Sequence, residues 1–147
     1  MAKERPIYEE NTEFTKLAIQ IVEKYPEHFY GIKMDQVCCV NIVNKDRPTT
    51  KKQAWRIDAV KMPMALHCAY GWYVVLFAKD WDEFGETQKL LLVSEILHSL
   101  PSDESDEGKV VPMDTKGYAA MYRTFNGIDY LDDPDAPNIL EKDVVWK

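Results

Sequence analysis

The sequence predicts an α+β fold, formed by a single domain over residues 1–147 with a small sheet of three or four strands. Two long segments repeat apolar residues at three- and four-residue spacing, which is the period of a helix. Short runs rich in β-branched residues lie between these segments and are typical of strands. The resulting order is helix, three strands, helix, acidic loop and helix, which favours an α+β domain with a mixed or antiparallel sheet.

The first helix is expected over residues 8–24, where apolar side chains recur on one face. Asn11 or Thr12 can cap its start, and Pro26 ends it. His28 follows this helix and is expected to be exposed.

Three strands are expected after the first helix. Residues 36–43 are rich in β-branched and small apolar residues, and residues 54–63 alternate apolar with polar side chains. A polar, basic loop joins them. Residues 71–81 form a continuous apolar run of strand length, which is expected to be a buried strand.

The strongest helical pattern covers residues 86–100 and stops at Pro101. A further helix is expected over residues 114–126, with Asp114 as its N-cap. Residues 132–147 form a C-terminal tail that ends in a short apolar piece resembling a strand.

The composition excludes several classes of protein. Apolar residues make up 46% of the chain, which is enough for a folded core. The net charge of -7, concentrated at 102–107 and 129–135, argues against binding to nucleic acid or to an anionic membrane. Residues 1–13 lack the apolar core of a signal peptide, so a cytoplasmic protein is expected. Its three cysteines are then expected to be reduced; they are Cys38, Cys39 and Cys68.

One stretch carries possible chemistry, since Ser94-Glu95-Ile96-Leu97-His98 differs by one residue from the zinc motif His-Glu-x-x-His. Two histidines four residues apart on a helix can bind one zinc ion, and the glutamate can act as general base on zinc-bound water. His98 can supply one nitrogen, but Ser94 cannot replace the other because a neutral hydroxyl is a poor zinc ligand. The same letters also suit an ordinary core helix with one hydrogen-bonded histidine.

The surrounding residues resemble the phage metallopeptidase family. The segment 72–98 has an aromatic-Val-Val strand, a turn of the Asp-x-Trp type and the helix of the motif. Residues 102–114 and 115–131 resemble the acidic stretch and the following helix of that family, so the resemblance covers roughly residues 30–131.

The resemblance implies a zincin-like fold, a phage or prophage source and a location in the cytoplasm of the bacterial host. That fold has an N-terminal helix, a short sheet and the metal-type helix 86–100 packed on it. Two expected histidines are missing, because Ser94 and Met113 stand at their positions. Glu95 remains as a general base, and His98 and Asp114 remain as weak metal ligands.

Other ligands are conceivable. His67 and Cys68 precede the buried strand and join the site if that strand delivers them to the helix. The carboxylates at 103–107 could also reach it.

Three functions follow from these residues. The favoured one is a degenerate zincin that has lost catalysis, needs no cofactor and binds a host or phage protein. The second is an active metal-dependent hydrolase with altered ligands, using zinc if it uses any metal. The third is an acidic phage-encoded inhibitor of a host protein, whose negative stretches contact a basic partner.

Overall fold

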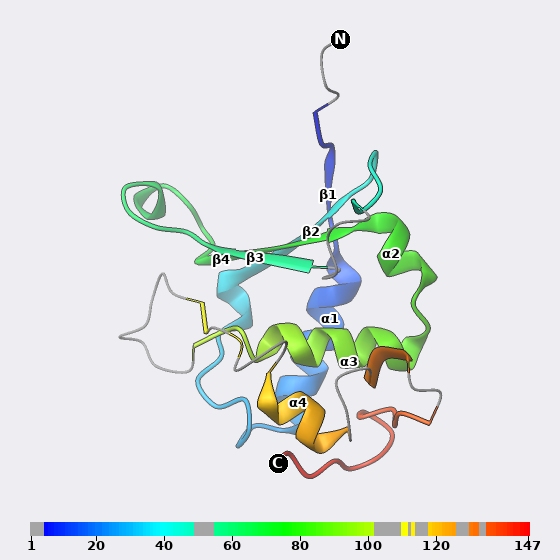
Figure 1. The fold of residues 1–147 in the computed structure, drawn as a ribbon. Coiled ribbons are helices and arrows are strands. Elements are labelled where there is room, and N and C mark those ends of the chain that lie inside the picture. The colour runs from blue at the N-terminus through cyan, green and yellow to red at the C-terminus, as the bar shows by residue number, and fades with distance from the viewer. Residues whose placement is uncertain are drawn as a thin grey trace.

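The computed structural model describes residues 5–48, 55–101, 110–111, 113, 118–125, 130–132 and 135–147. Within these residues, a four-stranded mixed sheet carries helices α1, α3 and α4 on one of its faces (Figure 1). The strands are β1 (Tyr8–Glu10), β2 (Val37–Ile42), β3 (Trp55–Ala59) and β4 (Trp72–Phe77). The helices are α1 (Thr12–Lys24), α2 (Ala78–Glu83), α3 (Glu86–Leu97) and α4 (Ala119–Thr124). The predicted α+β class and the small sheet are therefore confirmed.

The strands lie in the order β1-β2-β4-β3. The two central strands β2 and β4 are parallel, and the edge strands β1 and β3 are antiparallel to their neighbours. Side chains alternate between the two faces of a strand. On the face toward the helices, the two central strands place five core residues, namely Val37, Cys39, Trp72, Val74 and Leu76.

The N-terminal helix starts later than the sequence predicts. Tyr8–Glu10 pairs with β2 as an edge strand, so these residues use their backbone groups in the sheet and not in a helix. Asn11 caps α1, because its side-chain oxygen accepts a hydrogen bond of 2.9 Å from the backbone N–H of Phe14. Its own N–H donates to the carbonyl of Cys39, which fixes the turn from strand to helix.

Helix α3 lies in the middle of the molecule, and it is shorter than the predicted range 86–100. Its residues Leu90, Leu91, Leu92 and Val93 are all fully buried, and four consecutive positions point in different directions around a helix. The burial of α3 is therefore not confined to one face of the helix. Neighbours enclose α3 on most sides, and α1 makes the most extensive of these contacts.

Two other predicted elements change at their ends. The expected strand 71–81 is β4 followed directly by α2, whose Trp81 is buried and donates its indole N–H to Glu13 on α1 over 2.8 Å. The predicted helix 114–126 appears as α4 over Ala119–Thr124, while residues 114–117 and 126 lie outside the described residues.

The C-terminal tail is not a strand in its described part. It is held to the end of α1 by Lys24, whose ammonium donates hydrogen bonds of 2.8–3.0 Å to the carbonyls of Ile139, Leu140 and Lys142. Ile139 is fully buried, so the tail contributes to the core. None of the helices in the described ranges combines the length and the apolarity that a membrane span requires.

Candidate functional site

Ser94 faces the protein interior. Its side chain is fully buried, and its hydroxyl donates a 2.9 Å hydrogen bond to the carbonyl of Leu90, one turn earlier on α3. Such a bond back to the preceding turn is common for a serine within a helix. The hydroxyl is therefore directed along its own helix and not toward a ligand position beside His98.

His98 lies at the C-terminal end of α3, and both of its ring nitrogens are in contact with polar groups. Nδ1 is 2.6 Å from the carbonyl oxygen of Ser94, and Nε2 is 2.8 Å from Nε2 of His28. A carbonyl oxygen can only accept, so Nδ1 carries the hydrogen and donates it. In the neutral ring the lone pair is then on Nε2, which accepts the hydrogen of His28 Nε2.

Aromatic rings surround this histidine pair. The ring of Trp146 stacks on His28 with a centroid distance of 4.7 Å and an interplanar angle of 8°. Phe29 and Tyr118 lie against His98, with centroids at 5.2 Å and 6.0 Å. Burial among these rings lowers the pKa of His28 and so favours its neutral form. The C-terminal tail thus covers the histidine of the motif.

Glu95 points toward a different set of partners. Its carboxylate accepts a 2.9 Å hydrogen bond from the indole N–H of Trp55 on β3. The buried hydroxyl of Tyr130 lies beside it, although it forms no hydrogen bond of regular geometry within the described residues. Burial raises the pKa of Glu95, and the two neighbouring donors only partly offset this effect.

The position that would supply a third ligand is only partly described. Met113 is half-buried and packs against the core, as a thioether side chain commonly does. Asp114 and the carboxylates at 103–107 lie outside the described residues. In the part of the chain that the structure describes, no three His, Cys, Asp or Glu side chains converge as metal ligands.

His67 and Cys68 do not reach Glu95 or His98. Both lie on the loop 60–71, which joins β3 to β4 and extends beyond the sheet in Figure 1. His67 is exposed, and the thiol of Cys68 is 3.5 Å from the hydroxyl of Tyr73. The described geometry therefore gives no support for adding them to the ligand set.

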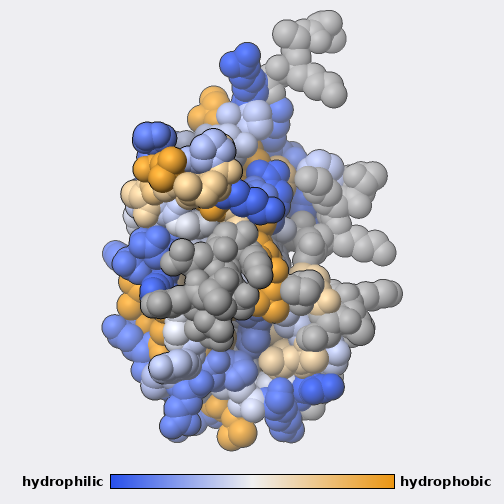
Figure 2. Space-filling view, turned by 90° about the vertical axis from the view of Figure 1, so that its left-hand side faces the viewer, coloured by the Kyte–Doolittle hydropathy of each residue, from blue (hydrophilic) through white to orange (hydrophobic). Residues whose placement is uncertain are grey.

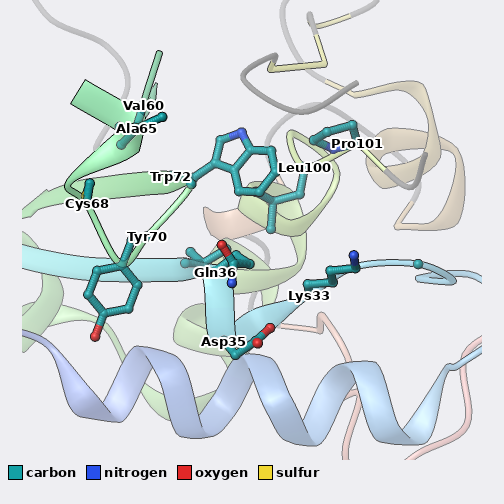
Figure 3. A pocket seen from close by; sticks show the side chains of 13 residues that line it. Lys33, Asp35, Gln36, Val60, Ala65, Cys68, Tyr70, Trp72, Leu100 and Pro101 are labelled. Carbon is teal, nitrogen blue, oxygen red and sulfur yellow. The ribbon is translucent and has the colours of Figure 1, made fainter. Parts of the chain in front are cut away.

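The structure also shows a cavity of about 600 Å³ between the loop 60–71, the turn before β2 and the end of α3 (Figure 3). Trp72 and Leu100 form one wall, while Lys33, Asp35 and Gln36 lie opposite them. The sequence gives no indication of this cavity, because its walls come from three distant segments.

Two partners of the motif were also missed. His28 keeps part of its surface exposed, as expected, but one side of its ring is covered. It is bonded to His98, and Trp146 from the C-terminal tail covers the pair. The sequence alone gave little indication of these two partners, because His28 and Trp146 lie outside the main helical patterns.

Comparisons with protein-family models, with curated proteins and with solved structures found no match to this chain.

Proposed function

We propose that this chain is a zincin-like relative of the phage metallopeptidases that has lost catalysis and acts by binding a host or phage protein in the bacterial cytoplasm. The resemblance over residues 30–131 supports the ancestry. The arrangement of the fold agrees with it, since an N-terminal helix and the helix of the motif lie on one face of a short sheet.

The hydrogen bonds of the two His98 ring nitrogens are the main support for the proposal that catalysis is lost. A zinc ligand must direct a nitrogen lone pair at the metal, and about two further protein ligands would have to converge with it, whereas the described residues hold no group of three such ligands. Here Nδ1 of His98 donates to Ser94, and Nε2 faces His28 at 2.8 Å under the ring of Trp146. Ser94 is buried and bonded to Leu90, and Glu95 is bonded to Trp55.

The loop 60–71 supports the proposal of a binding role. Met62, Met64 and Leu66 are 66%, 73% and 66% exposed. Figure 2 looks onto the side from which this loop projects and shows hydrophobic surface at the level of the loop. Exposed apolar side chains that cluster often mark a protein contact, and flexible methionines suit an adaptable one.

A peptidase assay tests the loss of catalysis. The native chain with added Zn²⁺ is incubated with unfolded protein substrates, and Glu95→Gln serves as a matched control because it keeps the shape of the side chain. The proposal expects equal, background cleavage by both proteins. Cleavage by the native chain that Glu95→Gln abolishes would show a working hydrolase.

A binding assay tests the second part. A partner that co-purifies from bacterial cells is identified, purified and titrated with the native chain and with a variant carrying serine at positions 62, 64 and 66. We expect this variant to lose at least tenfold in affinity, because a few side chains commonly carry most of the binding energy of an interface. The matched control carries serine at Ile7 and Val43, which are exposed elsewhere, and should bind normally. Equal loss in both variants, or in neither, contradicts a binding role of the loop.

A further inference from the structure

Residues 143–147 of the tail, here called the strap, lie over the ends of α1 and α4 without forming a helix or a strand (Figure 1). Two backbone N–H groups of the strap donate to side-chain hydroxyls of the rest of the domain. The N–H of Val144 donates to Tyr25 over 3.0 Å, and the N–H of Lys147 donates to Thr124 over 3.0 Å. A hydroxyl that accepts from one backbone can accept in the same way from the backbone of another segment.

Exposure alternates along the strap. Val144 and Trp146 pack against the core, whereas the side chain of Asp143 is 98% exposed and Val145 is 80% exposed. An alternation of this kind is typical of an extended chain that has one face in contact with a protein. The strap therefore docks through alternate side chains and through backbone hydrogen bonds, as a bound extended peptide does.

The ring of Trp146 fills a site made of aromatic side chains, here called the ring pocket. It stacks on His28 with an interplanar angle of 8° and meets Tyr25 edge-on at 90°, and both geometries are favourable for aromatic pairs. Five rings from three separate segments surround it at centroid distances of 4.7–5.7 Å, namely Tyr25, His28, Phe29, His98 and Phe125. The ring pocket is therefore suited to an aromatic side chain.

The strap is an imperfect occupant of this pocket. Within the described residues, the indole N–H of Trp146 is buried and has no hydrogen-bond partner. A buried donor without a partner costs free energy, which the ring contacts must offset. Another segment that places an aromatic ring at this position and a backbone N–H near Tyr25 can therefore compete with the strap.

We propose that the ring pocket recognises an extended segment of a protein partner that carries an apolar residue and, two positions later, a tryptophan, and that the strap occupies the pocket as an intramolecular competitor. When the partner segment binds, its tryptophan replaces Trp146 against His28 and His98, and the strap is released. The inference adds a second binding surface to the proposed function. It does not rest on the loop 60–71, which lies far from the strap in Figure 1.

A peptide with the sequence of residues 143–147 is the probe, with a fluorotryptophan in place of its tryptophan, and its binding is measured by fluorine NMR. The strap keeps the ring pocket occupied in the native chain, and affinity falls with the fraction of molecules in which a site is free. Trp146→Ala empties the pocket and should bind the peptide at least about tenfold more tightly than the native chain does. Val145→Ser changes an exposed strap residue and should bind it as weakly as the native chain does.

A second variant keeps the test decisive if Trp146→Ala does not fold. Lys24→Met removes the donors to three tail carbonyls that lie outside the peptide, so it loosens the strap and leaves the ring pocket intact. Its ion pair with the exposed Asp143 contributes little. Lys24→Met should bind the peptide about two- to tenfold more tightly than the native chain does.

The role of the tryptophan is tested by competition. An unlabelled peptide with the sequence of residues 143–147 should displace the probe, and the same peptide with alanine in place of the tryptophan should not. The variant with serine at positions 62, 64 and 66 should bind the probe as the native chain does, so this proposal and the binding role of the loop can fail separately. Equal binding of the probe by the native chain, Trp146→Ala and Lys24→Met, or equal displacement by both peptides, overturns the proposal.

Discussion

Replacing Ser94 by histidine restores the letter that the zinc motif lacks and tests how this position is packed. The side chain of Ser94 is fully buried, and its hydroxyl is bonded to Leu90. An imidazole at this position overpacks the core at a cost of about 1–3 kcal/mol. A buried ring nitrogen without a partner adds about 1–3 kcal/mol. Ser94→His should therefore lower the free energy of unfolding by about 2–6 kcal/mol, a large part of the ~5–15 kcal/mol typical of a domain.

Urea unfolding followed by tryptophan fluorescence measures this effect. With a slope of about 2 kcal/mol per M, the midpoint should fall by about 1–3 M. Ser94→Ala is the matched control, since the lost hydrogen bond and the better helix propensity of alanine nearly cancel, within about 1 kcal/mol. If zinc at 100 times its dissociation constant bound only the folded variant, it would restore about 2.7 kcal/mol. A Ser94→His variant as stable as Ser94→Ala without metal would refute the burial argument.

Three further predictions concern stability. Burial raises the pKa of Glu95 in the folded state above the unfolded value of 4.5, so the native chain loses stability as the pH rises from 4.5 through the folded pKa. Glu95→Gln should remove this loss, so the two proteins should be equally stable below pH 4.5. Above pH 4.5 the free energy of unfolding of the variant should exceed that of the native chain by about 1.4 kcal/mol for each unit of difference between the folded and unfolded pKa. Urea unfolding from about pH 4 to 8 measures this difference. A variant less stable at pH 8 would contradict this. Lys24→Met keeps the apolar stem of the side chain but removes the donors to three tail carbonyls. It should lower the free energy of unfolding by about 1.5–3 kcal/mol and speed amide hydrogen exchange in residues 139–144. Unchanged exchange there would show that other contacts hold the tail. Asn11→Ala removes the N-cap of α1 and the bond to Asn41, and should cost about 1–2 kcal/mol in thermal unfolding, whereas Asn11→Asp, which keeps the cap, should cost less.

The sequence was most informative where one local pattern decides the structure. The cap at Asn11 and the three main strand segments follow from periodicity and from capping chemistry. The edge strand Tyr8–Glu10 could not be predicted, because its three residues gain their hydrogen bonds only from β2. The burial of α3 on most sides could not be predicted either. A serine such as Ser94 normally indicates an exposed helix position, and its burial depends on the elements that pack around α3.

The contacts of Glu95 and His98 could not be predicted from the sequence either. Glu95 and His98 stand three residues apart and suggest a common site, yet they contact Trp55 and His28 respectively. These partners are 40 and 70 residues away in the chain. Contacts of this kind are set by the packing of the whole domain, and no spacing within the motif reports them.

The most direct test of the account is the zinc content of the native chain, purified without an affinity tag and measured by elemental analysis. The account predicts far less than one zinc per chain, because His98 bonds to Ser94 and to His28, and the described residues place no third His, Cys, Asp or Glu ligand beside this pair. Near-stoichiometric zinc that is lost in His98→Ala would contradict the account and indicate a metal centre with an unexpected ligand set.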